Sequence, residues 1–248
     1  MTFGNPMSIR DRVQNTIDLG RFTRATGLLQ RRRLNYLRAA KAEPLNGQQR
    51  RMEIFRALDA HFKFDAFIET GTYLGRTTRF FAESGRPVWT CEINRMHVFA
   101  AAVGLDGIDN VTLVMTSSEK FLRLLAPTLG QSRVFIYLDA HWNDYLPLRD
   151  EFEIIRANFP NAVVMVDDFK VPNDPGYAYD NYGPGKSLEL SYLGNLVAPD
   201  AFSTYVPKAP SNTETGFRRG TLFATHNQVF KAHLDQEPLL RQVTAKDA

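Results

Sequence analysis

The segment between residues 65 and 81 constrains the fold of this chain more than any other part of its sequence. Residues 66–68 are apolar, which is typical of a buried strand, and an amphipathic helical pattern follows a few residues later. Between the two stands Glu-Thr-Gly-Thr-Tyr-Leu-Gly, with Glu69 at the end of the strand and glycines at 71 and 75. Glycines at such a turn let the backbone approach a ligand closely. This pattern predicts a strand–turn–helix unit that binds a nucleoside.

A second acidic residue narrows the kind of ligand. Glu92 ends the next apolar run and follows Gly71 by 21 residues, which is about the offset at which a Rossmann-type unit places a carboxylate on a ribose. The turn lacks the Gly-x-Gly-x-x-Gly of dinucleotide sites, and the Gly-Lys-Ser of residues 185–187 lacks the earlier glycine and the strand of a phosphate loop. S-adenosylmethionine fits best, because it has no phosphates. Glu69 would hold its cationic amino-acid end, and Glu92 would accept two ribose hydroxyls.

From residue 65 onward, short apolar runs alternate with helical patterns. Such alternation is typical of a parallel sheet with helices on both faces, and two later runs would add an antiparallel edge. The sequence therefore predicts an α/β fold: a Rossmann-like, doubly wound, seven-stranded, mostly parallel sheet with an antiparallel edge strand. The expected strands are Ala66–Glu69, Val88–Glu92, Val111–Met115, Val134–Asp139, Ala162–Val166, Ala201–Val206 and Gly220–Ala224.

The parts outside the strand–helix alternation have their own patterns. Residues 171–186 are rich in proline, glycine and tyrosine, which predicts a long binding loop or lid. Helices are expected between the parallel strands, across Ser187–Leu196, and from His226 onward. Apolar residues at helical spacing predict an N-terminal helical segment over residues 1–47, as a cap or a homodimer contact, with residues 48–248 as the main domain.

Charge is unevenly distributed along the chain. Residues 1–60 hold 12 Lys and Arg against 5 Asp and Glu, and Arg31–Arg33 is the densest positive run. Such a run contacts nucleic acid or another anionic partner, or it is a solvated helix face. No aromatic residues interleave with it as stacking platforms would. We therefore expect no nucleic-acid partner.

Composition also bears on the compartment. A single cysteine, Cys91, excludes a disulfide framework and favours a reducing environment. No apolar run reaches the roughly 18–20 residues of a membrane span, and the first ten residues lack the apolar core of a signal peptide. We therefore expect a cytoplasmic protein without a membrane partner.

Polar side chains follow each of the five expected parallel strands. The carboxyl ends of such strands meet at one edge of the sheet, where ligands bind, so we expect these groups to share one site. The polar residues are Glu69, Glu92, Thr116–Ser118, Asp139 with His141, and Asp167 with Asp168.

The glycine-containing turn resembles motif I of the class I S-adenosylmethionine-dependent methyltransferases, and the resemblance extends over roughly residues 60–226. Tyr-Leu-Asp-Ala-His at residues 137–141 and Val-Asp-Asp-Phe at residues 166–169 look like the metal-dependent O-methyltransferases of the macrocin O-methyltransferase type. The resemblance implies that Mg²⁺ or another divalent cation binds three carboxylates, at Asp139, Asp167 and Asp168.

The same resemblance suggests a catalytic base. The family often has an acidic general base two residues after its first metal ligand, where this chain has His141. A metal-bound hydroxyl becomes more acidic, and a neutral histidine near its ordinary pKa can remove the proton at neutral pH. The oxygen then attacks the sulfonium methyl group in line. We expect His141 and Asp139 to be the catalytic residues.

The expected contacts divide between the methyl donor and the methyl acceptor. For the donor they are Glu69, Thr70, Gly71, Thr72, Tyr73, Gly75, Thr77, Glu92, Ser117, Ser118 and Asp139. For the acceptor they are the aromatic residues Trp142, Tyr145, Tyr177 and Tyr182.

The leading prediction is an O-methyltransferase that acts on a small hydroxylated molecule, such as a sugar, a polyketide or a phenolic. A nucleic-acid or protein methyltransferase that uses the basic N-terminal segment is an alternative. Against it, residues 139–142 read Asp-Ala-His-Trp rather than the Asn/Asp-Pro-Pro-Tyr of amino-directed enzymes. A non-catalytic nucleoside-binding protein of the same fold is a third reading, which the converging carboxylates disfavour.

Overall fold

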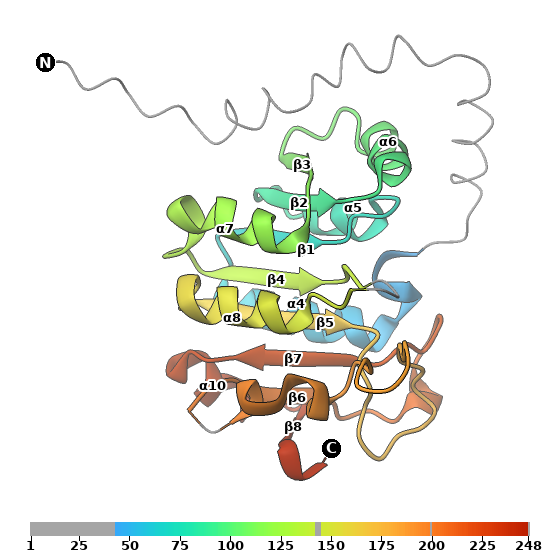
Figure 1. Cartoon of the computed structure of the whole chain (residues 1–248), viewed down its shortest axis with the longest axis vertical. Helices are drawn as coiled ribbons and strands as arrows, with labels where there is room; N and C mark the ends of the chain where they lie inside the picture. The colour runs from blue at the N-terminus through green and yellow to red at the C-terminus, as the bar shows by residue number, and fades with distance from the viewer. Residues whose placement is uncertain (1–42, 142–144, 199, 248) are drawn as a thin grey trace, which may run out of the picture.

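The computed structural model of the chain describes residues 43–141, 145–198 and 200–247. These residues form one sheet of eight strands in the order β3-β2-β1-β4-β5-β7-β6-β8 (Figure 1). The strands are β1 (Ala66–Thr70), β2 (Val88–Glu92), β3 (Val111–Met115), β4 (Val134–Leu138), β5 (Ala162–Asp167), β6 (Ser203–Pro207), β7 (Thr221–Thr225) and β8 (Leu240–Val243). β1 to β5 pair in parallel, whereas β7, β6 and β8 add antiparallel pairs on one side.

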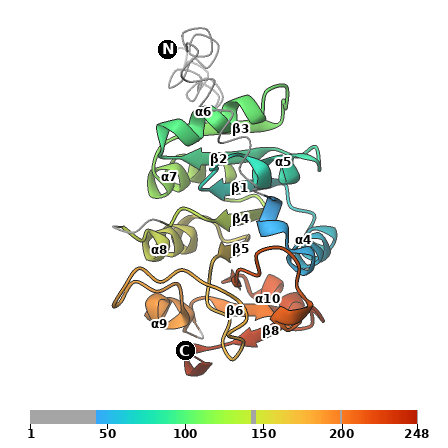
Figure 2. The same ribbon diagram turned by 90° about the vertical axis from the view of Figure 1, so that its right-hand side faces the viewer.

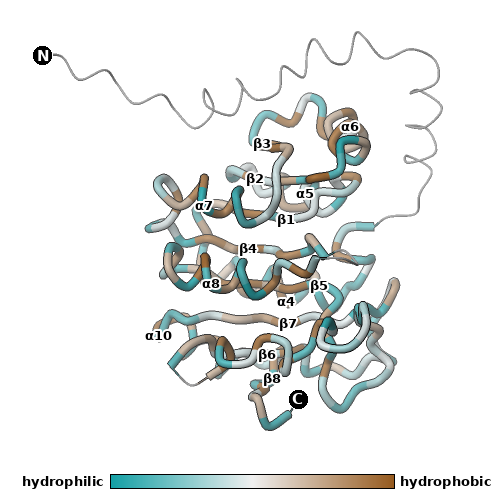
Figure 3. Tube along the Cα trace, in the orientation of Figure 1, coloured by the Kyte–Doolittle hydropathy of each residue, from teal (hydrophilic) through white to brown (hydrophobic). Residues whose placement is uncertain are grey.

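The five parallel strands coincide with the apolar runs of the sequence. β2 and β3 have the predicted bounds, and β1, β4 and β5 differ from prediction by one residue each. Every residue of β1, β4 and β5 is buried, and β4 and β5 are hydrophobic along most of their length (Figure 3). A sheet that is buried on both faces needs helices on both faces. The predicted doubly wound α/β fold is confirmed.

Alternate residues of the central strands belong to two hydrophobic clusters. Ile68 packs on one face with α7 and α8, whereas Phe67 packs on the other with α4 and α5. On that second face the ring of Phe55, from α4, lies 5.0 Å from the rings of Phe81 and Phe135. The two helical layers stand on opposite sides of the sheet in Figure 2. The period of two along each strand therefore decides which side chain meets which layer.

The helices between the parallel strands lie where the sequence predicts them, and their ends agree within three residues. The described α-helices are α4 (Gln49–Phe62), α5 (Arg76–Ala82), α6 (Arg95–Gly104), α7 (Ser118–Leu129), α8 (Leu148–Asn158), α9 (Leu190–Leu193) and α10 (Gln228–Leu234). Short 3₁₀ turns are η1 (Pro44–Gly47), η2 (Gly194–Val197), η3 (Ser211–Thr213) and η4 (Ala245–Asp247).

The sheet has one strand more than the seven that the sequence predicts. The prediction of a helix from His226 onward holds only for α10, because the chain then forms β8, which pairs antiparallel with β6. β8 has four residues, of which only Leu240 and Val243 are buried, so its sequence shows no strand period. It forms because the edge of β6 offers unpaired backbone groups. Its pairing therefore depends on tertiary structure and not on its own sequence.

The helix predicted across Ser187–Leu196 is also wrong in part. Only α9 is α-helical, and η2 follows it, because Gly194 has φ 56° and interrupts the helix. Residues 171–186 form the predicted long connection, with no element beyond isolated bridges.

The predicted N-terminal helices, Arg31–Arg33 and the predicted dimer contact lie outside the described residues. The described end of that segment is Glu43 and η1, whose Leu45 is fully buried and donates its N–H to Thr77 Oγ1 (3.2 Å). Of the helices that the structure describes, none combines the length and the apolar character needed to cross a bilayer.

The turn after β1 brings the backbones of β1 and β4 together at Gly71. Gly71 has φ +84°, and a Cβ at this position would lie 2.2 Å from Asp139 O. Gly85 also has a positive φ, +74°, but a Cβ there would meet nothing within 4 Å. Substitution of these two glycines therefore distinguishes the cost of backbone strain, which both positions share, from the cost of a steric clash, which only Gly71 has.

We predict that Gly71→Ala lowers the free energy of unfolding by more than about 3 kcal/mol, because strain and a backbone clash add. Gly85→Ala, the matched control, lowers it by only roughly 1–2 kcal/mol through strain alone. Urea denaturation of both variants measures the difference. Equal losses in the two variants would show that the contact with Asp139 does not matter.

Candidate active site

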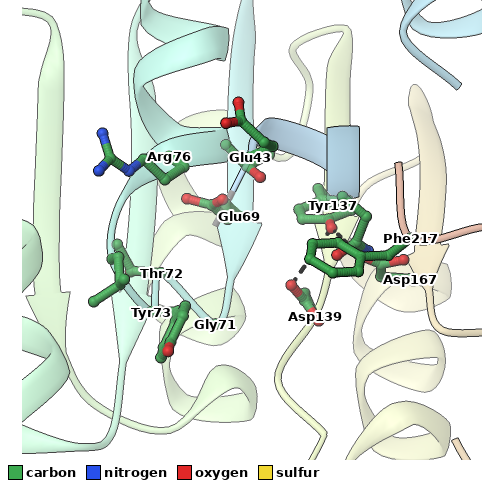
Figure 4. A pocket seen from close by; sticks show the side chains of 13 residues that line it. Glu43, Glu69, Gly71, Thr72, Tyr73, Arg76, Tyr137, Asp139, Asp167 and Phe217 are labelled. Atoms are coloured by element: carbon green, nitrogen blue, oxygen red, sulfur yellow. Dashed lines mark hydrogen bonds between the residues drawn. The ribbon is translucent and has the colours of Figure 1, made fainter. Parts of the chain in front are cut away.

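A cavity of about 270 Å³ lies at the carboxyl ends of β1 and β4. Parallel strands end here, so their last residues and the following turns form its walls. In Figure 4, Glu69 and the turn residues lie on one side, and Tyr137, Asp139 and Asp167 lie on the other. The predicted residues that line it are Glu69, Gly71, Thr72, Tyr73, Thr77, Asp139 and Asp167.

Backbone hydrogen bonds hold the turn between β1 and α5. The N–H groups of Gly71 and Thr72 both donate to Cys91 O, at 2.9 and 3.0 Å, which ties the turn to β2. Tyr73 has φ 47°, and its N–H donates to Glu92 Oε2 (3.0 Å). A non-glycine residue in this conformation is strained, and such strain gathers at functional sites. Glu92 therefore keeps the turn in shape.

Glu69 is a buried carboxylate in the wall of this cavity, only 1% exposed. Its Oε2 accepts hydrogen bonds from the hydroxyls of Thr78 and Thr90, the latter at 2.7 Å. Burial raises the pKa of Glu69 to about 7, although the two hydroxyls favour the ionised form. A cationic ligand group beside Glu69 would favour its ionised form further.

A second cavity, of about 180 Å³, lies on the other side of the turn. Glu92, Ser117, Ser118 and Tyr145 line it, as does Gly71, which also lines the first cavity. The two cavities therefore both border the turn at Gly71. Gly75 lines neither of them; it has φ +72° and forms the N-cap of α5.

Asp167 is bound by neighbouring side chains from several elements. Its Oδ1 accepts from the Arg51 guanidinium and from Asp168 N–H (2.7 Å). Its Oδ2 accepts from Asn46 Nδ2 (2.8 Å) and from the Tyr137 hydroxyl. Burial alone would raise the pKa of Asp167, but the Arg51 charge and these hydrogen bonds outweigh it and lower that pKa.

The other two carboxylates of the predicted metal site behave differently. Asp168, at φ 53°, accepts from Arg219 Nε, yet burial and the Asp167 charge raise its pKa to about 7. Asp139 is half-buried, and burial together with Asp167 and Asp168 raises its pKa well above the usual range. Tyr137 hydroxyl lies 3.4 Å from Asp139 Oδ2. Among the described residues, Asp139 is thus the member of the trio that no arginine side chain binds.

This arrangement does not fit a magnesium ion. A carboxylate has about four lone-pair sites, and four donors already occupy those of Asp167. Within residues 43–141, 145–198 and 200–247, no three His, Cys, Asp or Glu side chains are placed to hold a metal ion. The predicted metal site at Asp139, Asp167 and Asp168 is not confirmed.

His141 also differs from its prediction. Its side chain is buried and lines neither cavity, and its ring nitrogens have no hydrogen-bond partner among the described residues. Burial lowers the pKa of His141 to about 4, which makes it a weak base. The predicted role as general base is not confirmed.

The aromatic residues predicted for the acceptor lie apart from one another. Tyr145 lines the second cavity, and its hydroxyl donates to Asp150. Tyr177 is buried and lines neither cavity, and the Tyr182 hydroxyl donates to Asp180. Trp142 lies outside the described residues. The structure therefore does not bring Tyr145, Tyr177 and Tyr182 into one acceptor pocket.

One predicted donor residue contacts a buried acid instead of a cavity. Thr70 Oγ1 donates to Glu151 Oε1 (3.0 Å) beneath the turn, and neither residue lines the two cavities. Glu151, on α8, is fully buried, and burial raises its pKa to about 7. Glu151 thus accepts a hydrogen bond from the end of β1, on the face of the sheet that α8 covers.

Sequence reasoning missed several residues of the site. Arg51 left one usable signal in the sequence, because it stands four residues before Phe55 and so falls on the apolar side of α4. An arginine on an apolar stripe is buried only when it is paired. Leu74 and Tyr137 stand inside the two quoted motifs but look like core residues. The remaining residues gave no pattern, because they enter from separate segments. They are Glu43, Asn46, Arg76, Phe217 and Arg219.

Comparison by sequence gives no match, either to a family model or to a curated protein. Comparison by structure gives several. An O-methyltransferase from Bacillus cereus in complex with SAH has a TM-score of 0.53 and 17% identity over 86% of this chain and 98% of its own. TomG, an O-methyltransferase from Streptomyces achromogenes involved in tomaymycin synthesis and bound to SAM, has a TM-score of 0.51 and 16% identity, over 70% and 78%.

A third similar structure is a SAM-dependent methyltransferase from Aquifex aeolicus. Its TM-score is 0.50 and its identity 14%, over 78% of this chain and 96% of its own. At sequence identities this low, the structural similarity establishes a common fold and nothing more. The fold implied by the glycine turn and the strand order is confirmed.

Glu151 makes stability depend on pH. Its pKa is about 7 when folded and about 4.5 when unfolded, so the folded state binds the proton more tightly. This stabilisation is complete below pH 4.5 and is lost as the pH rises through 7. We predict that Glu151→Gln removes up to about 3 kcal/mol of the fall in unfolding free energy between pH 5 and pH 8.

Urea denaturation at the two pH values measures this effect. Glu83→Gln, which changes an exposed glutamate at the end of α5, is the control and should keep the wild-type slope. An unchanged slope in Glu151→Gln would contradict the prediction.

Proposed function

We propose that this chain, which has the class I fold of S-adenosylmethionine-dependent methyltransferases, transfers a methyl group from S-adenosylmethionine to a hydroxyl of a small molecule. The observation that carries the proposal is a pair of cavities that both border Gly71, with Glu92 lining one and Glu69 and Asp139 lining the other. Both cavities lie beyond the carboxyl ends of the parallel strands, where this class of sheet binds its ligands.

The donor would extend across the turn. Its ribose hydroxyls would donate to Glu92, and its adenine would lie in the smaller cavity beside Ser117 and the exposed Ile93. Its amino-acid end would lie in the larger cavity. Glu69 and Asp139 suit the ammonium and sulfonium charges, because neither is in an ion pair with a described side chain.

The acceptor would enter the larger cavity from the side of Phe217. This side chain is 60% exposed at the cavity and offers a ring face to a sugar, a polyketide or a phenolic. The positive charge of the donor would favour the ionised form of Asp139. The Asp139 carboxylate would then take the hydroxyl proton, the oxygen would bond to the methyl carbon, and the carbon–sulfur bond electrons would return to sulfur. The products are a methyl ether, a thioether and a protonated Asp139.

This assignment of the base follows from position. Asp139 lines the cavity that would hold both reactants, whereas His141 lines neither cavity. Holding the hydroxyl in line with the sulfonium methyl would supply much of the rate. No magnesium ion takes part in this step, because two of its three expected ligands, Asp167 and Asp168, already bind arginine side chains.

Donor binding should depend on the charge of Glu69. The pKa of Glu69 is about 7, so the carboxylate ionises as the pH rises through that value. We predict that the affinity for S-adenosylhomocysteine, measured by titration calorimetry, rises by roughly fivefold between pH 6 and pH 7.5. Glu69→Gln should bind more weakly and lose this dependence.

The control is again Glu83→Gln, which should bind like the wild type at both pH values. If the wild-type chain binds neither S-adenosylhomocysteine nor S-adenosylmethionine, the proposed function fails. If it binds them but Glu69→Gln keeps the full pH dependence, only the role of Glu69 is wrong.

The two candidate bases can be separated by substitution. We predict that Asp139→Asn lowers kcat by about 100-fold or more, the usual range for loss of a general base. His141→Asn should lower it by less than about tenfold, because the ring touches neither cavity. Transfer of a labelled methyl group to a panel of sugars, polyketides and phenols measures both. The reverse order of effects would restore His141 as the base.

A further inference from the structure

A buried arginine binds one of the carboxylates that the family resemblance assigns to a divalent cation. Arg51 extends from the first turn of α4, its side chain is 0% exposed, and it forms an ion pair with Asp167, which is 2% exposed. Its other terminal nitrogen donates to the carbonyls of Arg219 and Gly220. Removal of the guanidinium from this position would leave the charge of Asp167 buried and unpaired.

The hydrogen bonds of Asp167 leave no place for a further cation. Its Oδ1 accepts two of them and its Oδ2 accepts two, from donors on α4, η1, β4 and the following residue. A metal ion would have to displace at least one donor. It would then lie next to the Arg51 guanidinium, which has the same sign of charge.

A second arginine binds the neighbouring carboxylate. Arg219 Nε donates to Asp168 Oδ1, and Arg219 Nη2 donates to Asp180 Oδ1. Asp180 N–H also donates to Asp168 O (2.9 Å). Arg219, Asp168 and Asp180 are therefore joined in a closed set of hydrogen bonds. The planar fork of arginine suits this double contact with two carboxylates.

We propose that Arg51 and Arg219 act as built-in cations, which occupy the coordination positions of Asp167 and Asp168 so that the site keeps no resident divalent cation. The inference rests on the proposed function, because it concerns how the acceptor half of that site balances its charge. Both arginines are positioning residues, since they act on Asp167 and Asp168 and leave Asp139 as the member of the trio without an arginine partner among the described residues.

The test is cation binding by the full-length chain, without turnover. Mn²⁺ binding is followed by electron paramagnetic resonance and Mg²⁺ binding by calorimetry, after removal of metals with a chelator. The variants are Arg51→Met, Arg219→Gln and the double substitution. Arg86→Gln is the matched control, because Arg86 binds both oxygens of Asp59 at a distant ion pair.

The wild type and Arg86→Gln should bind neither cation more tightly than about 1 mM. The double variant should bind Mn²⁺ at least about tenfold more tightly, and the additional Asp167→Asn should abolish that gain. Wild-type binding in the micromolar range that Asp167→Asn abolishes would overturn the proposal. So would a folded double variant that binds no more Mn²⁺ than the control.

A second variant guards against loss of folding. If circular dichroism shows that Arg51→Met does not fold, Arg219→Gln alone carries the test, because Arg219 is partly exposed. It frees Asp168 and should bind Mn²⁺ more tightly than Arg86→Gln; equal binding would overturn the proposal. S-adenosylhomocysteine binding by the same samples tests the proposed function separately, since it requires no metal.

Discussion

The close contact between Gly71 and the backbone of Asp139 organises this structure. Asp139 N–H donates to Thr70 O at 3.0 Å, and the absence of a side chain at Gly71 lets the turn pack against Asp139 O. This contact joins the ends of β1 and β4, so the two cavities share a wall. A larger residue at position 71 would clash with Asp139 O and could not keep this packing.

Charge balance at the ends of β4 and β5 is the second constraint. Buried carboxylates are stable only where hydrogen bonds or opposite charges compensate for lost solvation. Arg51 provides that charge for Asp167 and couples α4 to the sheet edge, while Arg219 couples the start of β7 to the loop at Asp180. Glu69 and Asp139, which line the larger cavity, form no ion pair with a described side chain, whereas Asp167 in the same wall pairs with Arg51. A carboxylate that an arginine binds thus stabilises the fold, whereas one without such a partner is available to a ligand.

Most of the parallel sheet could be predicted because its strands are buried on both faces. Residues 134–138 and 162–166 are continuous apolar runs, and such runs can be recognised without knowledge of their neighbours. β8 could not be predicted, because its pairing depends on an open edge of β6. The acidic strand ends were recognised from their positions after each run. Their partners were not, because Asn46, Arg51 and Arg219 are distant from Asp167 and Asp168 in sequence.

By itself the sequence determined the sheet, the glycine turn and the row of polar residues along its edge, because these follow from local patterns of burial and backbone freedom. Only the tertiary structure decided what each carboxylate does. Glu92 holds the backbone of Tyr73, Asp167 holds Arg51, and Asp139 faces the cavity. The physical reason is that the charge state of a buried acid depends on the groups that folding places around it, and these groups come from elements far apart along the chain.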